Sequence, residues 1–264
     1  MKTLIKIGGT LLDSAESRQR LAAEIGQAVQ AGLKAVVVHG GGKQMTRFLD
    51  ERGVESRFLN GLRVTTPEVL DAVLKVFAGS VNQEVVAAFI AKGVPAVGLT
   101  GMDGLLTEAR QMSAELGLVG KPVRSDPRLL NLLMESGYLP VVACVAGDRH
   151  GQFYNVNADQ MAASLASAIQ AEKLLFLTDV DGLWDQDKAI CPTITINKCR
   201  QLIDQGIASG GMRAKLEAAM EALRSGIGEV VIAPGGVAGI IDKLLAGGRI
   251  GTRLLTEMGV PSNG

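Results

Sequence analysis

Two lysines that lie far apart in the sequence are the residues best suited to chemistry in this chain of 264 residues. Lys6 interrupts an apolar run just before Gly8-Gly9, and Lys215 follows Gly210-Gly211 at the start of a predicted helix. Glycine turns leave backbone N–H groups free to hold phosphate or carboxylate oxygens, and the lysines add full positive charge. Either lysine alone could be an ordinary solvated side chain. Together they favour phosphoryl transfer.

Four polar residues could hold the other reactant. Asn155 and Asn157 each donate and accept hydrogen bonds, which suits an amide or a carboxylate ligand. Either Asn157 or Asp159 could simply cap the alanine-rich helix that follows, but capping explains one residue only. Asp159 could instead hold two lysines in place. Arg63 offers a fork for a substrate carboxylate, although a lone arginine is more often a surface residue.

Other reactive residue types favour no alternative chemistry. His39, which precedes the run Gly40-Gly41-Gly42, is expected to be structural and neutral, and His150 to lie at the surface. The three cysteines show no C-x-x-C spacing, so neither thiol catalysis nor a metal site is expected. Trp184 could pack near a nucleotide or in the core. Neither a P-loop nor a dinucleotide fingerprint is present in the sequence.

The composition narrows the class of protein. Hydrophobic residues make up 47%, aromatic residues only 3%, and the net charge is zero. An aliphatic chain of this kind is typical of helices packed on a parallel sheet, and zero net charge does not favour nucleic acid or an anionic membrane as partner. No unbroken apolar run approaches the ~18 residues of a membrane span, and no signal peptide is recognised. We expect a cytoplasmic protein that binds small molecules.

Apolar runs alternate with helical patterns, which predicts a mainly parallel α/β sheet with right-handed crossovers. In such sheets ligands bind beyond the carboxyl ends of the strands, where the glycine runs lie. The less regular stretch 101–121 is expected to hold small antiparallel strands. The buried strands are expected at 3–7, 34–39, 95–100, 139–146, 173–178 and 229–233.

Local signals predict several helix ends. Asp13 with Glu16 resembles a capping box for a helix that ends near Gly32. Thr66 and Pro67 suit the start of the longest helix, which runs towards Gly93. This helix carries more apolar residues than one packed face needs, so it is either a core helix or one that also contacts a second subunit.

Six motifs in a fixed order carry a family resemblance along essentially the whole chain. They are Lys6-Ile7-Gly8-Gly9, His39-Gly40-Gly41-Gly42, Asn60-Gly61-Leu62-Arg63-Val64-Thr65, Asn155-Val156-Asn157-Ala158-Asp159, Thr178-Asp179-Val180-Asp181-Gly182 and Gly211-Met212-Arg213-Ala214-Lys215. Each motif alone is weak, but the six in order resemble the amino acid kinase family, and within it the members that phosphorylate N-acetyl-L-glutamate.

The resemblance implies a fold and a reaction. The fold is a three-layer α/β/α sandwich around a mainly parallel sheet, in a single domain 1–264. The reaction is the ATP-dependent phosphorylation, with Mg²⁺, of the side-chain carboxylate of N-acetyl-L-glutamate in arginine biosynthesis. A hinge near Ala171 would separate a lobe 1–170, for the acceptor and dimerisation, from a nucleotide-binding lobe 171–264. A homodimer through the 67–92 helix is implied, and the early first strand resembles short, arginine-insensitive members.

The resemblance also assigns roles by motif position. Lys6 and Lys215 would stabilise the transferring phosphoryl group, and Asp159 would orient both lysines. The acceptor would be bound by Gly41, Gly42, Arg63, Asn155 and Asn157. The nucleotide would be bound by Gly8, Gly9, Thr178, Asp179, Val180, Asp181, Gly182, Leu183, Trp184, Ile207, Ala208 and Ser209. No residue is assigned as a metal ligand.

Two alternatives stay open. One is a sister kinase that acts on carrier-linked aminoadipate or glutamate, on free glutamate or on carbamate. The other is a non-catalytic sensor of nucleotides or amino acids on the same fold. The pattern Asn155-x-Asn157-x-Asp159 favours an acetylated acceptor, and a sensor would have no need of both lysines and Asp159.

Overall fold

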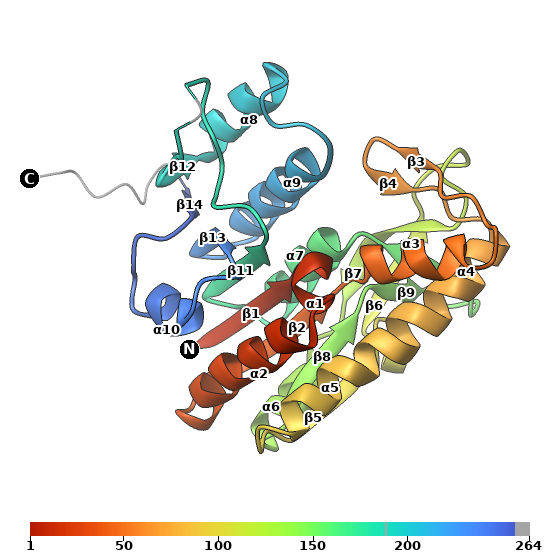
Figure 1. Ribbon diagram of the computed structural model, residues 1–264, viewed down its shortest axis with the longest axis horizontal. Helices are drawn as coiled ribbons and strands as arrows, with labels where there is room; N and C mark the ends of the chain where they lie inside the picture. Colours follow the sequence, from red (N-terminus) through yellow and green to blue (C-terminus); the bar gives the residue numbers. More distant parts are fainter. Residues whose placement is uncertain (188, 257–264) are drawn as a thin grey trace, which may run out of the picture.

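The computed structural model describes residues 1–187 and 189–256, and its centre is a twisted sheet covered by helices on both faces (Figure 1). Eight strands lie in the order β12-β14-β13-β11-β1-β2-β8-β5. Neighbouring strands run parallel in every pair except β13 with β14, where they are antiparallel. The predicted mainly parallel α/β fold is therefore confirmed.

Five of the six predicted strands are present with small shifts at their ends, whereas β12 and β14 were not predicted. The central strands are nearly continuous apolar runs, as expected for a sheet buried on both faces. The strands of the large sheet are β1 (Lys2–Ile7), β2 (Lys34–His39), β5 (Ala96–Thr100), β8 (Leu139–Ala143), β11 (Lys173–Thr178), β12 (Thr193–Thr195), β13 (Glu229–Pro234) and β14 (Thr252–Leu255).

The predicted strand 139–146 is not one strand. It divides at Cys144 into β8 and β9 (Val145–Gly147), and β9 leaves the large sheet to pair with β10 (Phe153–Val156). The N–H of Cys144 donates to His39 O at 3.2 Å, while its own carbonyl accepts from Val156 N–H at 3.1 Å. Cys144 thus joins two sheets, which an unbroken apolar sequence does not reveal.

Strands β9 and β10 complete a small closed barrel with β6 (Thr107–Gln111) and β7 (Val119–Ser125). Because β6 and β7 are antiparallel, the expectation of small antiparallel strands in 101–121 is confirmed, although β7 continues beyond it. A separate short antiparallel hairpin, β3 (Phe58–Leu59) and β4 (Leu62–Arg63), lies near α3 and α4 (Figure 1).

The helices form the two outer layers. Helix α2 packs against α5 and α10 on one face of the sheet, and α7 packs against α9 on the other (Figure 1). The helices outside the long 67–90 segment are α1 (Gly9–Leu12), α2 (Ala15–Gln30), α3 (Gly42–Asp50), α6 (Arg128–Glu135), α7 (Ala158–Ala168), α8 (Ile196–Asp204), α9 (Gly210–Arg224) and α10 (Ile240–Leu245), with a 3₁₀ turn, η2, at Asp103–Leu105.

The predicted capping box of α2 is wrong by one residue. The cap is Ser14, whose hydroxyl accepts from the N–H of Ser17 at 3.3 Å. Asp13 instead ends the unpredicted turn α1 and forms an ion pair with Arg47 at 2.7 Å. Gly32 follows the helix with a φ of +98°, which agrees with the predicted helix end.

The long helix begins as predicted, since the Thr66 hydroxyl accepts from the N–H of Val69 at 3.2 Å. It runs as α4 (Pro67–Val73), a π-helical segment η1 (Leu74–Val81) and α5 (Asn82–Ile90). The π segment was not predicted. By length and mean hydropathy this helix is apolar enough to cross a membrane, although polar residues such as Lys75 and Asn82 interrupt it. It packs on the sheet, as the core helices of other proteins also do. Most of its apolar side chains are buried within this one chain.

Two glycines near β14 differ in the space that their surroundings leave for a side chain. Gly251 (φ +76°) and Gly247 (φ +83°) are both left-handed, but a Cβ would overlap Ile232 O only at Gly251 and meets nothing within 4 Å at Gly247. We expect Gly247→Ala to lower the free energy of unfolding by about 1–2 kcal/mol, and Gly251→Ala by a further ~1–3 kcal/mol. Urea unfolding measures both changes, and equal losses would show that packing at Gly251 adds nothing.

Candidate active site

Lys6 and Lys215 meet at one buried carboxylate. Lys6 Nζ lies 2.8 Å from Asp159 Oδ1, and Lys215 Nζ lies 2.9 Å from Asp159 Oδ2. All three side chains are buried. Lys6 comes from the end of β1, Asp159 from the first turn of α7 and Lys215 from the second turn of α9. The structure therefore brings together the two lysines that the sequence places more than 200 residues apart.

This cluster carries one more positive than negative charge. Burial raises the pKa of Asp159, but Lys6 and then Lys215 outweigh that effect and hold the pKa at about 2. Burial, followed by repulsion from Lys6, lowers the pKa of Lys215. One carboxylate cannot neutralise two ammonium groups, so the cluster favours an additional anion beside it.

The residue that caps α7 explains why the carboxylate is free to meet the lysines. Asn157 Oδ1 accepts from the N–H of Asp159 at 2.9 Å and of Gln160 at 3.2 Å. The cap is thus Asn157 and not Asp159, which decides between the two sequence-based interpretations. Capping uses only the oxygen of Asn157, and its amide nitrogen takes no part in the cap.

A cavity of about 210 Å³ opens beside Lys6. Glycines of the first two glycine runs, the hairpin β3–β4 and strand β10 contribute to its wall. All five residues predicted to bind the acceptor line this cavity together: Gly41, Gly42, Arg63, Asn155 and Asn157. Asn155 is held by a hydrogen bond from its Nδ2 to Thr65 Oγ1 at 3.0 Å.

Arg63 is buried and firmly held, so it is not an ordinary surface arginine. Its Nη2 donates to Thr46 Oγ1 at 2.8 Å and to Gly42 O at 3.3 Å, and its Nη1 donates to Ser56 Oγ. The guanidinium also lies 4.6 Å from the centre of the Phe58 ring. Thr46 and Ser56 support the site although no sequence motif pointed to them.

The residues predicted to bind the nucleotide differ in how exposed their side chains are. Thr178 ends β11, and Ser209 stands at the start of α9, where its side chain makes no capping hydrogen bond. Trp184 is 53% exposed, which excludes the core position considered for it. By contrast, the side chains of Leu183 and Ala208 are buried in the core. Their N–H groups already donate to Thr252 Oγ1 at 2.8 Å and to Leu202 O at 3.0 Å, so neither N–H is free for a nucleotide.

The two glycines after β1 differ from each other. The N–H of Gly8 donates to Leu177 O at 2.8 Å and is therefore committed to the fold. Gly9 lines the cavity beside Lys6. The loop residues Asp179, Val180, Asp181 and Gly182 follow β11, and Ile207 packs against the core ahead of α9.

His39 is neutral and structural, as predicted. Its imidazole is fully buried, and burial lowers its pKa to about 4 against a smaller opposing effect of its hydrogen bond with Gly40. His150 is exposed. Burial raises the pKa of Cys144 to about 12, so this thiol is not a nucleophile although it borders the cavity.

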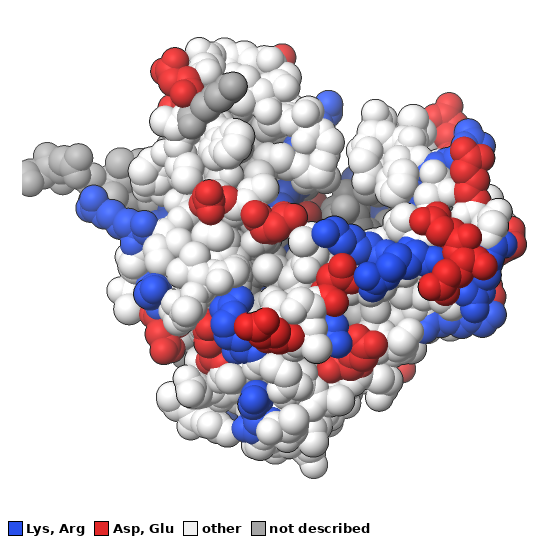
Figure 2. Space-filling view, viewed as in Figure 1, with Lys and Arg blue, Asp and Glu red and all other residues white. Residues whose placement is uncertain are grey.

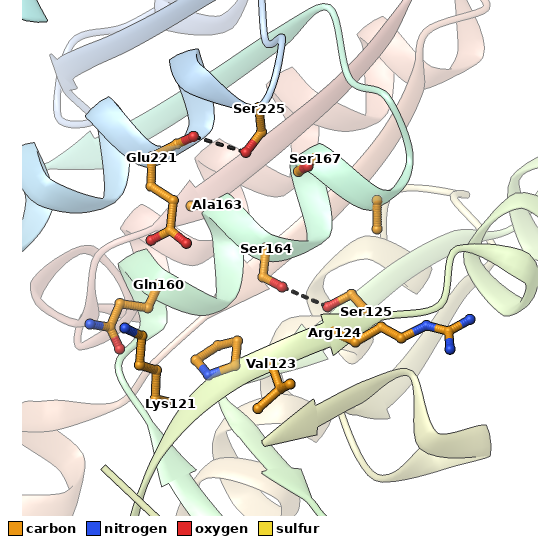
Figure 3. A pocket seen from close by; sticks show the side chains of 12 residues that line it. Lys121, Val123, Arg124, Ser125, Gln160, Ala163, Ser164, Ser167, Glu221 and Ser225 are labelled. Atoms are coloured by element: carbon orange, nitrogen blue, oxygen red, sulfur yellow. Dashed lines mark hydrogen bonds between the residues drawn. The ribbon is translucent and has the colours of Figure 1, made fainter. Parts of the chain in front are cut away.

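A second hollow of about 250 Å³ lies between β7, α7 and α9 (Figure 3). Ser164 of α7 and Ser125 of β7 form a hydrogen bond across it at 2.8 Å. None of the residues that the sequence analysis assigned to the site lines this hollow. The cavity beside Lys6, although smaller, is the candidate active site because the charged cluster and the glycine backbone are there.

The surroundings offer little to a resident metal ion. Within 1–187 and 189–256, no three His, Cys, Asp or Glu side chains are grouped so that they could hold one. Asp159 is already paired with two lysines.

On the face shown in Figure 2, acidic and basic side chains lie side by side rather than in one field of a single sign.

Known proteins with similar sequences agree with this geometry. The chain is 59% identical over 256 residues to the acetylglutamate kinase of Solibacter usitatus, covering 97% of this chain and all of that protein. It is 45% identical over 229 residues to the acetylglutamate kinase of Rubrobacter xylanophilus, covering 87% and 89% of the two chains.

Solved structures show the same fold in enzymes with different names. An N-acetylglutamate synthase from Neisseria gonorrhoeae, complexed with coenzyme A and N-acetyl-glutamate, superposes with a TM-score of 0.86 at 28% identity; the match covers 97% of this chain but 59% of that longer one. A carbamate kinase from Giardia lamblia, at 17% identity and a TM-score of 0.68, shows the fold alone. The model of the amino acid kinase family matches residues 1–234. This chain belongs to the amino acid kinase family.

Proposed function

We propose that this protein transfers the γ-phosphoryl group of ATP to the side-chain carboxylate of N-acetyl-L-glutamate, giving N-acetyl-L-glutamyl 5-phosphate and ADP in arginine biosynthesis. The observation that carries the proposal is the excess positive charge of Lys6, Asp159 and Lys215 beside the cavity that holds all the predicted acceptor residues. The extensive identity with proteins called acetylglutamate kinase supports the same substrate.

The cluster suits the difficulty of this reaction. The attacking carboxylate is already ionised, so no general base is required. Its oxygen attacks the γ-phosphorus, a new P–O bond forms, and the bond to the β-phosphate oxygen breaks as ADP leaves. The obstacles are repulsion between anions and negative charge on the equatorial oxygens of the transferred group. Lys6 and Lys215 would lower both, while Asp159 keeps them fixed before the substrates arrive.

The acceptor cavity favours a small acid with an acylated amine. Arg63 would bind the α-carboxylate, Asn155 the acetamido group, and the backbone N–H groups of Gly41 and Gly42 the reacting carboxylate. The hairpin closes one side, since a Cβ built on Gly61 would lie 3.3 Å from the carbonyl carbon of Gly210. A carrier-linked acceptor would need a wider opening there, which argues against that alternative.

The nucleotide would lie on the side of α9. Helix α9 has 15 residues, and its start at Ser209 has no side-chain cap, so its N–H groups and dipole favour a phosphate. The loop Thr178–Trp184 and residues 207–209 would hold the rest of ATP. Mg²⁺ would arrive as the Mg²⁺–ATP substrate, coordinated largely by phosphate oxygens.

The lobe assignment follows from these two sites. Residues 1–170 would bind the acceptor and residues 171–264 the nucleotide, with 257–264 outside the described residues. A cytoplasmic location belongs to the same proposal, because the substrates are small metabolites.

A homodimer through the 67–92 helix is also proposed, although burial within the chain removes the surplus of apolar surface that first suggested it. Two exposed features at the end of α5 and at the edge strand β5 now support the dimer. Ile90 is 53% exposed, and β5, the last strand of the large sheet, is only half-buried. A second copy could cover both features, which lie side by side because α5 packs on β5.

Removing either lysine tests the role of the charged cluster. We expect Lys6→Ala or Lys215→Ala to lower kcat by about 10²–10³-fold while changing the acceptor KM far less, because the lost charge acts on the transition state. Lys→Met variants at both positions preserve aliphatic volume and should lose the same amount. Lys243→Ala, at an exposed position of α10, serves as the matched control. Turnover near that of the wild type in both alanine variants would refute the mechanism.

A panel of acids separates the proposed reaction from its alternatives. ADP release is measured with N-acetyl-L-glutamate, L-glutamate, N-acetyl-L-aminoadipate and carbamate, and hydroxylamine traps acyl phosphates as hydroxamates. We expect kcat/KM to be at least ~100-fold higher for N-acetyl-L-glutamate than for L-glutamate, because Asn155 would lose its partner. Preference for another acid would indicate a sister kinase. If no acid in the panel causes ADP release, the protein would be a non-catalytic sensor.

Charge placed at the exposed end of α5 tests the dimer. Ile90→Arg is expected to convert a dimer into a monomer in sedimentation velocity, because an arginine would be buried without a partner at the contact. Leu132→Arg is the control, since Leu132 is 60% exposed on a different helix. A wild-type chain that sediments as a monomer, or an Ile90→Arg variant that stays dimeric, would contradict this contact.

A further inference from the structure

The buried imidazole of His39 makes two directed hydrogen bonds beneath the glycine run. Nδ1 lies 2.8 Å from the carbonyl oxygen of Gly40, and Nε2 lies 2.9 Å from Nδ2 of Asn82. A carbonyl oxygen can only accept, so the proton of the neutral ring is on Nδ1. Nε2 then carries a lone pair and accepts from Asn82. The neighbours therefore fix a single tautomer of His39.

The orientation of Asn82 is fixed in the same way. Its Nδ2 also lies 3.0 Å from Val141 O, so the group that faces both acceptors must be the amide nitrogen. Asn82 is buried. Position 98 of the neighbouring strand β5 is a glycine, and a Cβ there would overlap Asn82 Oδ1. Strand β5 thus leaves room for this amide.

These contacts determine where a backbone N–H points. The carbonyl of Gly40 and the N–H of Gly41 belong to one planar trans peptide, so they point in opposite directions. Because His39 holds the carbonyl, the N–H of Gly41 is directed away from the imidazole. Among the residues that the structure describes, this N–H has no hydrogen-bond acceptor. Gly41 itself lines the cavity beside Lys6.

We propose that His39 and Asn82 are positioning residues for phosphoryl transfer. Asn82 orients His39, and His39 holds the Gly40–Gly41 peptide so that the Gly41 N–H meets the reacting carboxylate of the acceptor. Neither side chain touches the substrate. This inference rests on the proposed function, which assigns that N–H to the acceptor, and it adds the two residues that aim it.

The long helix supports the same peptide from a second side. A Cβ built on Gly41 would lie 2.9 Å from Phe77 Cδ1 and 3.3 Å from Val81 Cγ2, so this segment packs directly against the Gly41 backbone. Phe77 and Val81 belong to the π-helical segment η1, and Asn82 follows it immediately. One stretch of helix therefore both supports Gly41 and orients His39.

Two substitutions at position 39 separate aiming from simple packing. His39→Asn keeps an amide donor near the place of Nδ1, whereas His39→Gln carries its amide to the place of Nε2 and leaves the Gly40 carbonyl without its donor. We expect His39→Gln to lower kcat/KM for the acceptor on the order of 10- to 100-fold, with the KM for ATP changed by less than about threefold. This loss is smaller than the ~10²–10³-fold that removal of an aimed donor costs, because the Gly41 N–H is misdirected and not removed. His39→Asn should recover most of that loss.

Asn82→Leu is expected to lower acceptor kcat/KM in the same direction but less, since His39 could still donate to Gly40. Thr107→Val is the control, because it also removes a fully buried polar group, from the barrel strand β6. A His39→Gln variant within about twofold of the wild type overturns the proposal. So do equal losses for ATP and acceptor in both position-39 variants, which would indicate general damage.

The tautomer is measurable without any change at position 39. The chain has only two histidines, so ¹⁵N-histidine labelling with His150→Gln to assign the signals isolates His39. We expect a neutral ring protonated on Nδ1 at pH 7, and a proton on Nε2 would overturn the proposal even if the variants fail to fold. If the wild type phosphorylates a different acid, the proposed substrate fails, and the positioning test is repeated with that acid.

Discussion

The pairing of two ammonium groups with one buried carboxylate is the interaction on which the site depends. Lys6, Asp159 and Lys215 come from β1, α7 and α9, so the cluster forms only when the centre of the sheet and the packing of α7 on α9 are complete. A buried charge without a partner is costly, and here both ammonium groups share the single carboxylate of Asp159. The remaining positive charge is unbalanced, which is why an incoming polyanion would be stabilised at this position.

Backbone geometry supplies what the lysines cannot, namely donors in fixed directions. The glycine run after β2 lines the cavity, and at Gly41 no side chain could fit against Phe77. Arg63 is held by Thr46, Gly42 and Ser56 before any substrate is present. Preorganisation of this kind lowers the reorganisation required during the reaction. The positive charge of the lysines and the directed hydrogen-bond donors therefore come from different parts of the chain, which meet at one cavity.

Much of this arrangement could be predicted from the sequence, because parallel strands place their carboxyl ends at one edge. That rule alone brings the run after Lys6 close to the run after His39. The π segment could not be predicted, since its apolar spacing differs little from that of an α-helix. Thr46 and Ser56 were also missed, because their contacts with Arg63 depend on how loops fold. The division at Cys144 escaped prediction because both of its strands are apolar.

The charged cluster also ties folding to pH in one direction. The pKa of Asp159 in the folded chain is about 2, below the value of about 4 expected in an unfolded chain. Its contribution to stability is therefore complete above pH ~4 and is lost as the pH falls towards 2. Near neutral pH the carboxylate stays ionised and keeps both lysines in place. A fall in activity between pH 7 and 5 would then have to arise from another group, because Asp159 does not change charge in that range.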